Sequence, residues 1–219
     1  MKGEYPMTAT TADNEAGALP ERSASFERFA GVCAILSGVS GLLYAVAFVV
    51  LQNVLLSGLF LMLGGLLTSA TLLAVYERLR KTDASFALLA LVLGLAGSLG
   101  STVHGGYDLA NAVDQQTPPS DLPNPVDPRG LLTFGVAGIA LLVVAWLIRR
   151  GGSFPGGLGY LGYVSSILLL ALYLGRLIVI DPESPLIVVP ALLSGFVINP
   201  LFYLWLGLTL LRRQSAWRG

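Results

Sequence analysis

A short polar stretch inside an otherwise apolar sequence holds the residues whose types and spacing could do chemistry. His104, Asp108 and Asn111 stand at positions i, i+4 and i+7, which places all three on one face of a helix. Tyr107 adds a phenol hydroxyl within the same stretch. An imidazole beside a carboxylate can bind a ligand or transfer a proton, because its surroundings set whether the histidine changes charge near neutral pH. The spacing predicts a polar pocket, but it supplies no complete set of nucleophile, base and orienting group, so we assign no catalytic residue.

A basic residue in a second apolar stretch could complete this pocket. Arg176 lies five residues before Asp181, at a depth similar to that of His104 and Asp108. An ionisable group inside a bilayer is costly unless it faces the protein interior and is paired. We therefore expect Arg176 to pair with Asp108, with His104 hydrogen-bonded nearby.

Several interpretations of this pocket stay open. The ion pair could be structural and fix the register of two helices, or Arg176 could extend to the interface and pair with Asp181 or Glu183. The pocket could also bind a ligand or transfer a proton. A metal site needs more ligands than His104 and Asp108 supply, namely Asp114 or Asp181. We expect neither a metal nor a cofactor.

A proline near the middle of the last apolar stretch predicts a break in that helix. Pro200 removes a helix hydrogen bond and clashes with the preceding turn. Asn199, directly before it, could satisfy the freed carbonyl groups, which would make the pair structural. Alternatively, the break belongs to a discontinuous helix that lines a substrate site, as in transporters.

The composition around these residues indicates a membrane protein. Of the 219 residues, 54% are hydrophobic and 12% are charged, whereas an average soluble domain carries roughly 25% charged residues. This balance excludes a soluble enzyme, a nucleic-acid-binding module and a disordered protein, and the net charge of zero gives nucleic acid no further support. The single cysteine, Cys33, excludes an intramolecular disulfide, and the single histidine excludes two-histidine zinc motifs.

Six apolar stretches are long enough to cross a bilayer, which takes about 20 residues of helix. Backbone groups in lipid must bond within their own segment, so these stretches are read as helices. The sequence predicts an all-α bundle of six transmembrane helices within residues 28–213, between a disordered tail of residues 1–27 and a C-terminal tail of residues 214–219. The predicted spans are residues 29–51, 54–76, 86–111, 131–148, 158–180 and 186–211.

The basic residues predict the orientation of these spans. All but two of the 13 Lys and Arg residues lie in the N-terminal tail, the second connection, the fourth connection or the C-terminal end. The exceptions are Arg129 and Arg176. Because cytoplasmic loops carry the Lys and Arg excess, both termini are expected in the cytoplasm, with the protein in the cell membrane.

Small residues in the third span predict close helix contacts, which would make this span central to the bundle. Gly105 and Gly106 would let another helix approach closely. Two rows recur every fourth residue, namely Gly94, Ser98 and Thr102, and Gly97, Ser101 and Gly105.

The motif Arg28-Phe29-Ala30-Gly31 opens the first span, and six spans follow within 219 residues. In this motif and layout the chain resembles a family of six-span bacterial membrane proteins classed as a domain of unknown function. The resemblance implies a protein of the bacterial cytoplasmic membrane, and it carries over no catalytic residue.

The sequence leaves two main function classes open and a third that it favours less. It favours a non-enzymatic scaffold or accessory subunit that holds a membrane-protein partner, or a second copy of itself, through faces of Gly and Ser. The alternative is a small-molecule or ion binder or carrier that uses the His104, Asp108 and Arg176 pocket and the break at Asn199-Pro200. An intramembrane enzyme is third, so the expectation leans against an enzyme. The lipid bilayer is the expected surrounding, and nucleic acid is not an expected partner.

Overall fold

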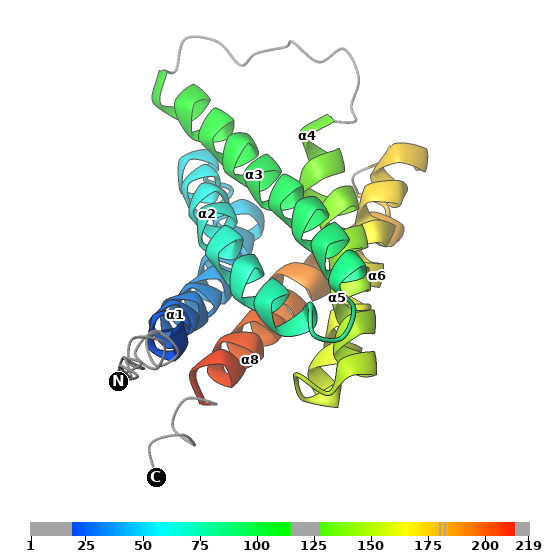
Figure 1. Cartoon of the computed structure of the whole chain (residues 1–219). Helices are drawn as coiled ribbons and strands as arrows, with labels where there is room; N and C mark the ends of the chain where they lie inside the picture. Colours follow the sequence, from blue (N-terminus) through cyan, green and yellow to red (C-terminus); the bar gives the residue numbers. More distant parts are fainter. Residues whose placement is uncertain (1–18, 115–127, 180, 182, 213–219) are drawn as a thin grey trace, which may run out of the picture.

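The computed structural model describes residues 19–114, 128–179, 181 and 183–212, and this part of the chain is helical without a strand (Figure 1). The helices are α1 (Leu19–Ala45), α2 (Val54–Leu79), α3 (Ala84–Asp114), α4 (Pro128–Gly130), α5 (Ala137–Gly151), α6 (Gly156–Ile178), α7 (Pro185–Leu193) and α8 (Asn199–Arg212). Three π-helical segments interrupt them. Segment η1 (Val46–Val50) continues α1, η2 (Leu131–Val136) joins α4 to α5, and η3 (Ser194–Ile198) joins α7 to α8.

Taken together with the π-helical segments, the helices form six continuous stretches that are long and apolar enough to cross a membrane, which confirms the predicted all-α fold with six spans. Large apolar side chains such as Val103, Ile167 and Leu186 are exposed on their surface, as a surrounding of lipid requires. The six apolar helices therefore indicate a multi-pass membrane protein. Their bounds are Ser25–Val50, Val54–Leu79, Ala84–Asp114, Leu131–Gly151, Gly156–Ile178 and Pro185–Arg212.

The first predicted boundary differs from the structure. Helix α1 already begins at Leu19, inside the stretch of residues 1–27 that the sequence assigns to a disordered tail. Glu27 forms an ion pair with Arg78 in the last turn of α2, and this contact holds the early turns of α1 against the bundle. The remainder of that tail, residues 1–18, and the predicted C-terminal tail, residues 214–219, lie outside the described residues.

The six spans form a ring that follows the order of the chain. Helix α1 packs against α2, α2 against α3, α3 against α5, α5 against α6, and α6 against α7, and α8 closes the ring against α1. The beginning of α1 and the end of α8 lie at the same end of the bundle as the α2–α3 and α5–α6 connections (Figure 1). We call this the basic end, because Arg78, Arg149 and Arg212 lie there.

Glycines set the closest contacts of α3 with its two neighbours in the ring. A Cβ atom on Gly105 would overlap backbone atoms of Gly58 in α2, and a Cβ atom on Gly97 would lie 2.8 Å from the Cβ of Ala137 in α5. The predicted rows of small residues therefore do pack against helices: the row of Gly94, Ser98 and Thr102 faces α2, whereas the other row meets α5 at Gly97 and α2 at Gly105. Gly106 does not, because the nearest atom to its added Cβ is the flexible sulfur of Met62 at 3.8 Å.

Candidate functional site

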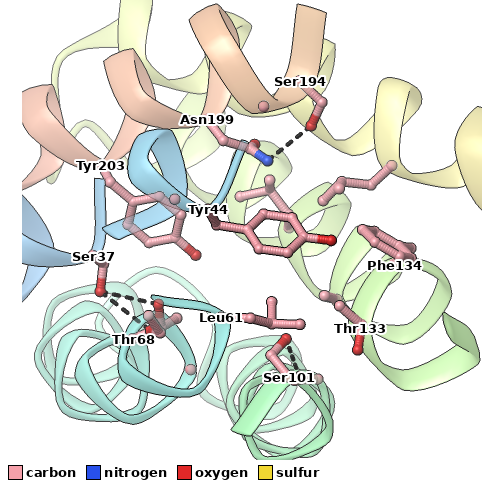
Figure 2. Close-up of a pocket in the computed structure, with 18 of the residues that line it drawn as sticks. Ser37, Tyr44, Leu61, Thr68, Ser101, Thr133, Phe134, Ser194, Asn199 and Tyr203 are labelled. Atoms are coloured by element: carbon pink, nitrogen blue, oxygen red, sulfur yellow. Dashed lines mark hydrogen bonds between the residues drawn. The ribbon is translucent and has the colours of Figure 1, made fainter. Parts of the chain in front are cut away.

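A cavity of about 620 Å³ lies within the ring, and all six spans contribute residues to its wall. Each of the three π-helical segments lies on this wall, η1 through Phe48. Segment η2 contributes Thr133 and Phe134, and η3 contributes Ser194 (Figure 2). Such segments are rare in proteins and often occur at functional sites. The irregularities of three different spans therefore converge on one cavity.

The cavity wall nearer the basic end is apolar. It is built from Leu72 and Val75 late in α2, Val144 in α5, and Phe202 and Leu206 in α8. Phe202 and Leu206 belong to the buried hydrophobic core of the bundle. A hydrocarbon chain or another apolar group is the chemical complement of this part of the wall.

Hydroxyl groups line the middle of the cavity (Figure 2). Thr68 donates a hydrogen bond to the Ser37 hydroxyl at 3.1 Å, so α2 and α1 are joined by side chains at this level. Ser101 donates to the carbonyl oxygen of Gly97, one turn earlier in α3, at 3.1 Å. These hydroxyls already have partners, and they give the wall polarity without charge.

Tyr44 of α1 differs from those hydroxyls because its ring extends into the cavity (Figure 2). The ring stacks on Phe48, with centroids 5.8 Å apart. Its hydroxyl lies within electrostatic range of both Asp108 and Arg176. Among the described residues, none shares a hydrogen bond with this hydroxyl, so it can bond a molecule in the cavity.

The predicted His104 and Asp108 pair is present at the end of the cavity opposite the basic end. His104 Nε2 lies 3.6 Å from Asp108 Oδ2, and His104 Nδ1 lies 3.4 Å from the Thr133 hydroxyl. The other carboxylate oxygen, Oδ1, accepts a hydrogen bond from Arg129 Nη1 at 3.4 Å. The Arg129 guanidinium also stacks on Tyr107, 4.2 Å from the ring centroid.

The arginine that pairs with Asp108 is therefore Arg129, where the sequence predicted Arg176. Within the described part of the chain, Arg176 forms no ion pair with Asp108, Asp181 or Glu183. Helix α6, which carries Arg176, is separated from α3 in the ring by α5, whereas η2 follows Arg129 directly and packs beside α3. The sequence did hold a clue to this pairing, because Arg129 is the single basic residue in the connections assigned to the outer side.

The predicted site residues divide into two groups. His104, Asp108, Arg176, Asn199 and Pro200 all line the cavity. The remaining three, Tyr107, Asn111 and Asp181, are not part of its wall.

The break at Asn199-Pro200 takes a form that the sequence did not predict. The π-helical segment η3 ends directly before Asn199, and the span continues through it as helix. The Asn199 side chain donates to the Ser194 hydroxyl at 2.8 Å and accepts a hydrogen bond from the Ser165 hydroxyl of α6. The expectation that Asn199 satisfies carbonyls freed by the proline is therefore wrong, because this side chain bonds a serine hydroxyl of its own span and, through Ser165, joins the last two spans, which are neighbours in the ring.

Within the described residues, no three His, Cys, Asp or Glu side chains form a group that could hold a metal ion. Comparisons with protein-family models, with curated proteins and with solved structures gave no match to this chain.

Proposed function

We propose that this chain is a membrane protein that binds a small molecule with an apolar body in the cavity at the centre of its helical ring. The observation that carries this proposal is the cavity itself, at about 620 Å³. Ligand pockets of proteins commonly measure roughly 300–1,000 Å³ and combine apolar walls with a few placed polar groups. The apolar wall and the groups around Tyr44 and Arg176 supply both features.

The energy of such a cavity also supports a ligand. Unfilled volume between apolar groups destabilises a protein, because the atoms that line it lose packing contacts. Water fills cavities that offer two to four polar partners per molecule, which the apolar wall at Val144 and Phe202 does not supply. An apolar group fits this part better.

The packing of the glycines weakens the scaffold interpretation that the sequence favoured. That interpretation needs faces of Gly and Ser that are available to another protein. Gly58 and Gly105 instead meet each other within the chain, Gly97 meets α5, and Gly207 of α8 meets Gly31 of α1. These contacts already use the small residues to close the ring, so the binder or carrier alternative is better supported.

The orientation and location complete the proposal. The basic end carries Arg28, Arg78, Arg149 and Arg212, and an excess of Lys and Arg marks the cytoplasmic side of a membrane. Both termini then lie in the cytoplasm, and the resemblance implies the bacterial cytoplasmic membrane as the location. Reporter proteins that are active only in the cytoplasm, fused to either terminus, test this placement, and an inactive fusion at both ends would overturn it.

A substitution that fills the cavity tests the binding function. Gly41 lines the cavity, and a Cβ atom there would meet no other atom within 4 Å. Gly41→Leu should therefore occupy the cavity without moving the backbone. Gly106→Leu is the matched control, because Gly106 is also open, with one atom at 3.8 Å, but lies outside the cavity wall.

The readout is binding of an apolar, environment-sensitive fluorophore to the purified full chain in lipid nanodiscs, with thermal unfolding measured in parallel. We expect Gly41→Leu to weaken binding by roughly tenfold or more, equivalent to about 1.4 kcal/mol. Gly106→Leu should bind like the wild type. Equal binding by both folded variants would refute a ligand site in the ring.

A further inference from the structure

The charges on the cavity wall are unequally compensated. Three residues that can carry a charge near neutral pH line it: Asp108, which is acidic, and His104 and Arg176, which are basic. The Asp108 carboxylate is contacted by His104 and by Arg129, so its negative charge has cationic and hydrogen-bonding neighbours. Arg176 has no ion pair with any described residue. The cavity therefore presents a net positive charge at this end.

Two phenol groups lie on the wall together with that positive charge. Tyr173 lies one turn before Arg176 in α6, and its ring is held against η2, where a Cβ atom on Gly135 would lie 3.0 Å from it. The Tyr44 hydroxyl reaches into the cavity from α1 and is within electrostatic range of both Asp108 and Arg176. Neither hydroxyl shares a hydrogen bond with another described residue. A guanidinium with neighbouring hydroxyl donors is the arrangement that binds carboxylate and phosphate groups.

These groups lie at the opposite end of the cavity from its apolar wall. Arg176 is in the last turn of α6, away from the basic end, whereas Val144, Phe202 and Leu206 lie nearer the basic end. The wall thus changes from charged to apolar along the axis of the bundle. A molecule that matches both parts has an anionic head and a hydrocarbon body.

We infer that the ligand of this cavity is an amphipathic anion, with its carboxylate or phosphate at Arg176, Tyr44 and Tyr173 and its apolar chain directed toward Phe202 and Leu206. This inference rests on the proposed function and adds the class of the ligand. A cationic ligand would need Asp108, which already contacts Arg129. Arg176 is exposed in the last turn of α6 and has no ion-pair partner among the described residues, so an uncharged apolar ligand would leave its charge unmatched.

Four competitors with the same chain length test the inference: a fatty acid, an alkyl phosphate, a fatty alcohol and an alkyl amine. Each displaces the apolar fluorophore from the full chain in nanodiscs of zwitterionic lipid, at a pH where the acid is ionised. We expect at least one of the two anions to bind about tenfold or more tightly than the alcohol, the size of one charge-assisted hydrogen bond. Whichever anion binds more tightly identifies the head group.

Variants separate the role of the charge from a general effect on folding. Arg176→Gln should remove the preference for the anion, because it lowers the affinity for the anion more than the affinity for the alcohol. Tyr44→Phe should reduce the preference by a smaller factor, because a neutral hydrogen bond is weaker than a charge-assisted one. Arg80→Gln is the control, since Arg80 is about half exposed at the basic end and pairs with Glu77 on the surface.

The outcomes distinguish this inference from the function on which it rests. Equal binding of acid, phosphate and alcohol by the wild type would overturn the anion inference while leaving the cavity a binding site. Tighter binding of the amine would overturn it as well. Fluorophore binding that Gly41→Leu does not weaken would overturn the proposed function itself.

Discussion

Replacing Gly105 with alanine is expected to force α2 and α3 apart where they cross. Gly105 is buried, and a Cβ atom there would overlap the carbonyl oxygen of Gly58 and the amide nitrogen of Met62, both in the backbone of α2. The corresponding substitution in α2 gives a lower bound for the helix separation. A Cβ atom on Gly58 would lie 2.8 Å from the carbonyl oxygen of Gly105, whereas ordinary contacts begin at 3.4 Å. Because a Cβ atom on Gly105 overlaps α2 more closely than this, the helices would separate by at least about 0.6 Å, which forfeits roughly a quarter to a half of the dispersion energy at the contact.

The expected loss for Gly105→Ala is about 1–3 kcal/mol of the free energy of unfolding, the usual cost of overpacking a well-packed contact. It exceeds the gain of up to about 1 kcal/mol that alanine brings to a helix in place of glycine. Gly106→Ala provides the comparison, because it makes the same chemical change one residue later. Its Cβ would meet only the sulfur of Met62 at 3.8 Å, so we expect unchanged or raised stability.

Unfolding of both variants by sodium dodecyl sulfate in mixed micelles, followed by tryptophan fluorescence, measures this difference. Thermal unfolding gives a second measure, at roughly 2–4 °C in Tm per kcal/mol for a chain of this length. Gly105→Ala should unfold several degrees below Gly106→Ala. Equal stability of the two variants would refute a backbone contact at this crossing and the ring geometry that depends on it.

Two side-chain interactions carry further predictions, measured by the same unfolding assay. Glu27→Ala should lower the free energy of unfolding by about 1–3 kcal/mol, because the Arg78 guanidinium loses its carboxylate partner. This guanidinium is only 11% exposed, and its Nη1 already has no hydrogen-bond partner within the described residues. Glu77→Ala, which removes an exposed ion pair from the same helix, should cost less than about 0.5 kcal/mol, and equal costs would contradict the burial argument. Asn199→Ala should cost about 1 kcal/mol by removing the hydrogen bonds to two serine hydroxyls, and wild-type stability would contradict the role of the Ser165 hydrogen bond in joining the last two spans.

The number and approximate bounds of the spans could be predicted because hydropathy is a local property. A helix in lipid satisfies its own backbone, so length and apolar composition decide where it lies. The π-helical segments could not be predicted in this way. Segment η2 lies where Leu132 packs onto Gly100 of α3, and such an irregularity depends on the neighbouring helix and not on the six residues alone.

The same division applies to the candidate site. His104 and Asp108 are separated by one helical turn, so their pairing follows from spacing, and the structure places their nearest atoms 3.6 Å apart. The partner arginine depends on which helices are neighbours. The sequence places Arg129 and Arg176 at similar depth, and only the order of the ring, with α5 between α3 and α6, separates them.

The small residues show how one composition serves two purposes. Gly58 and Gly105 have no side chain because another backbone lies against them. Gly41 and Gly64 have none although space is available, since the nearest atom to a Cβ on Gly64 lies at 3.7 Å and none lies within 4 Å of one on Gly41. Both of these glycines line the cavity. A ring held closed by the first kind of glycine and left open at its centre by the second kind is what the proposed binding function requires.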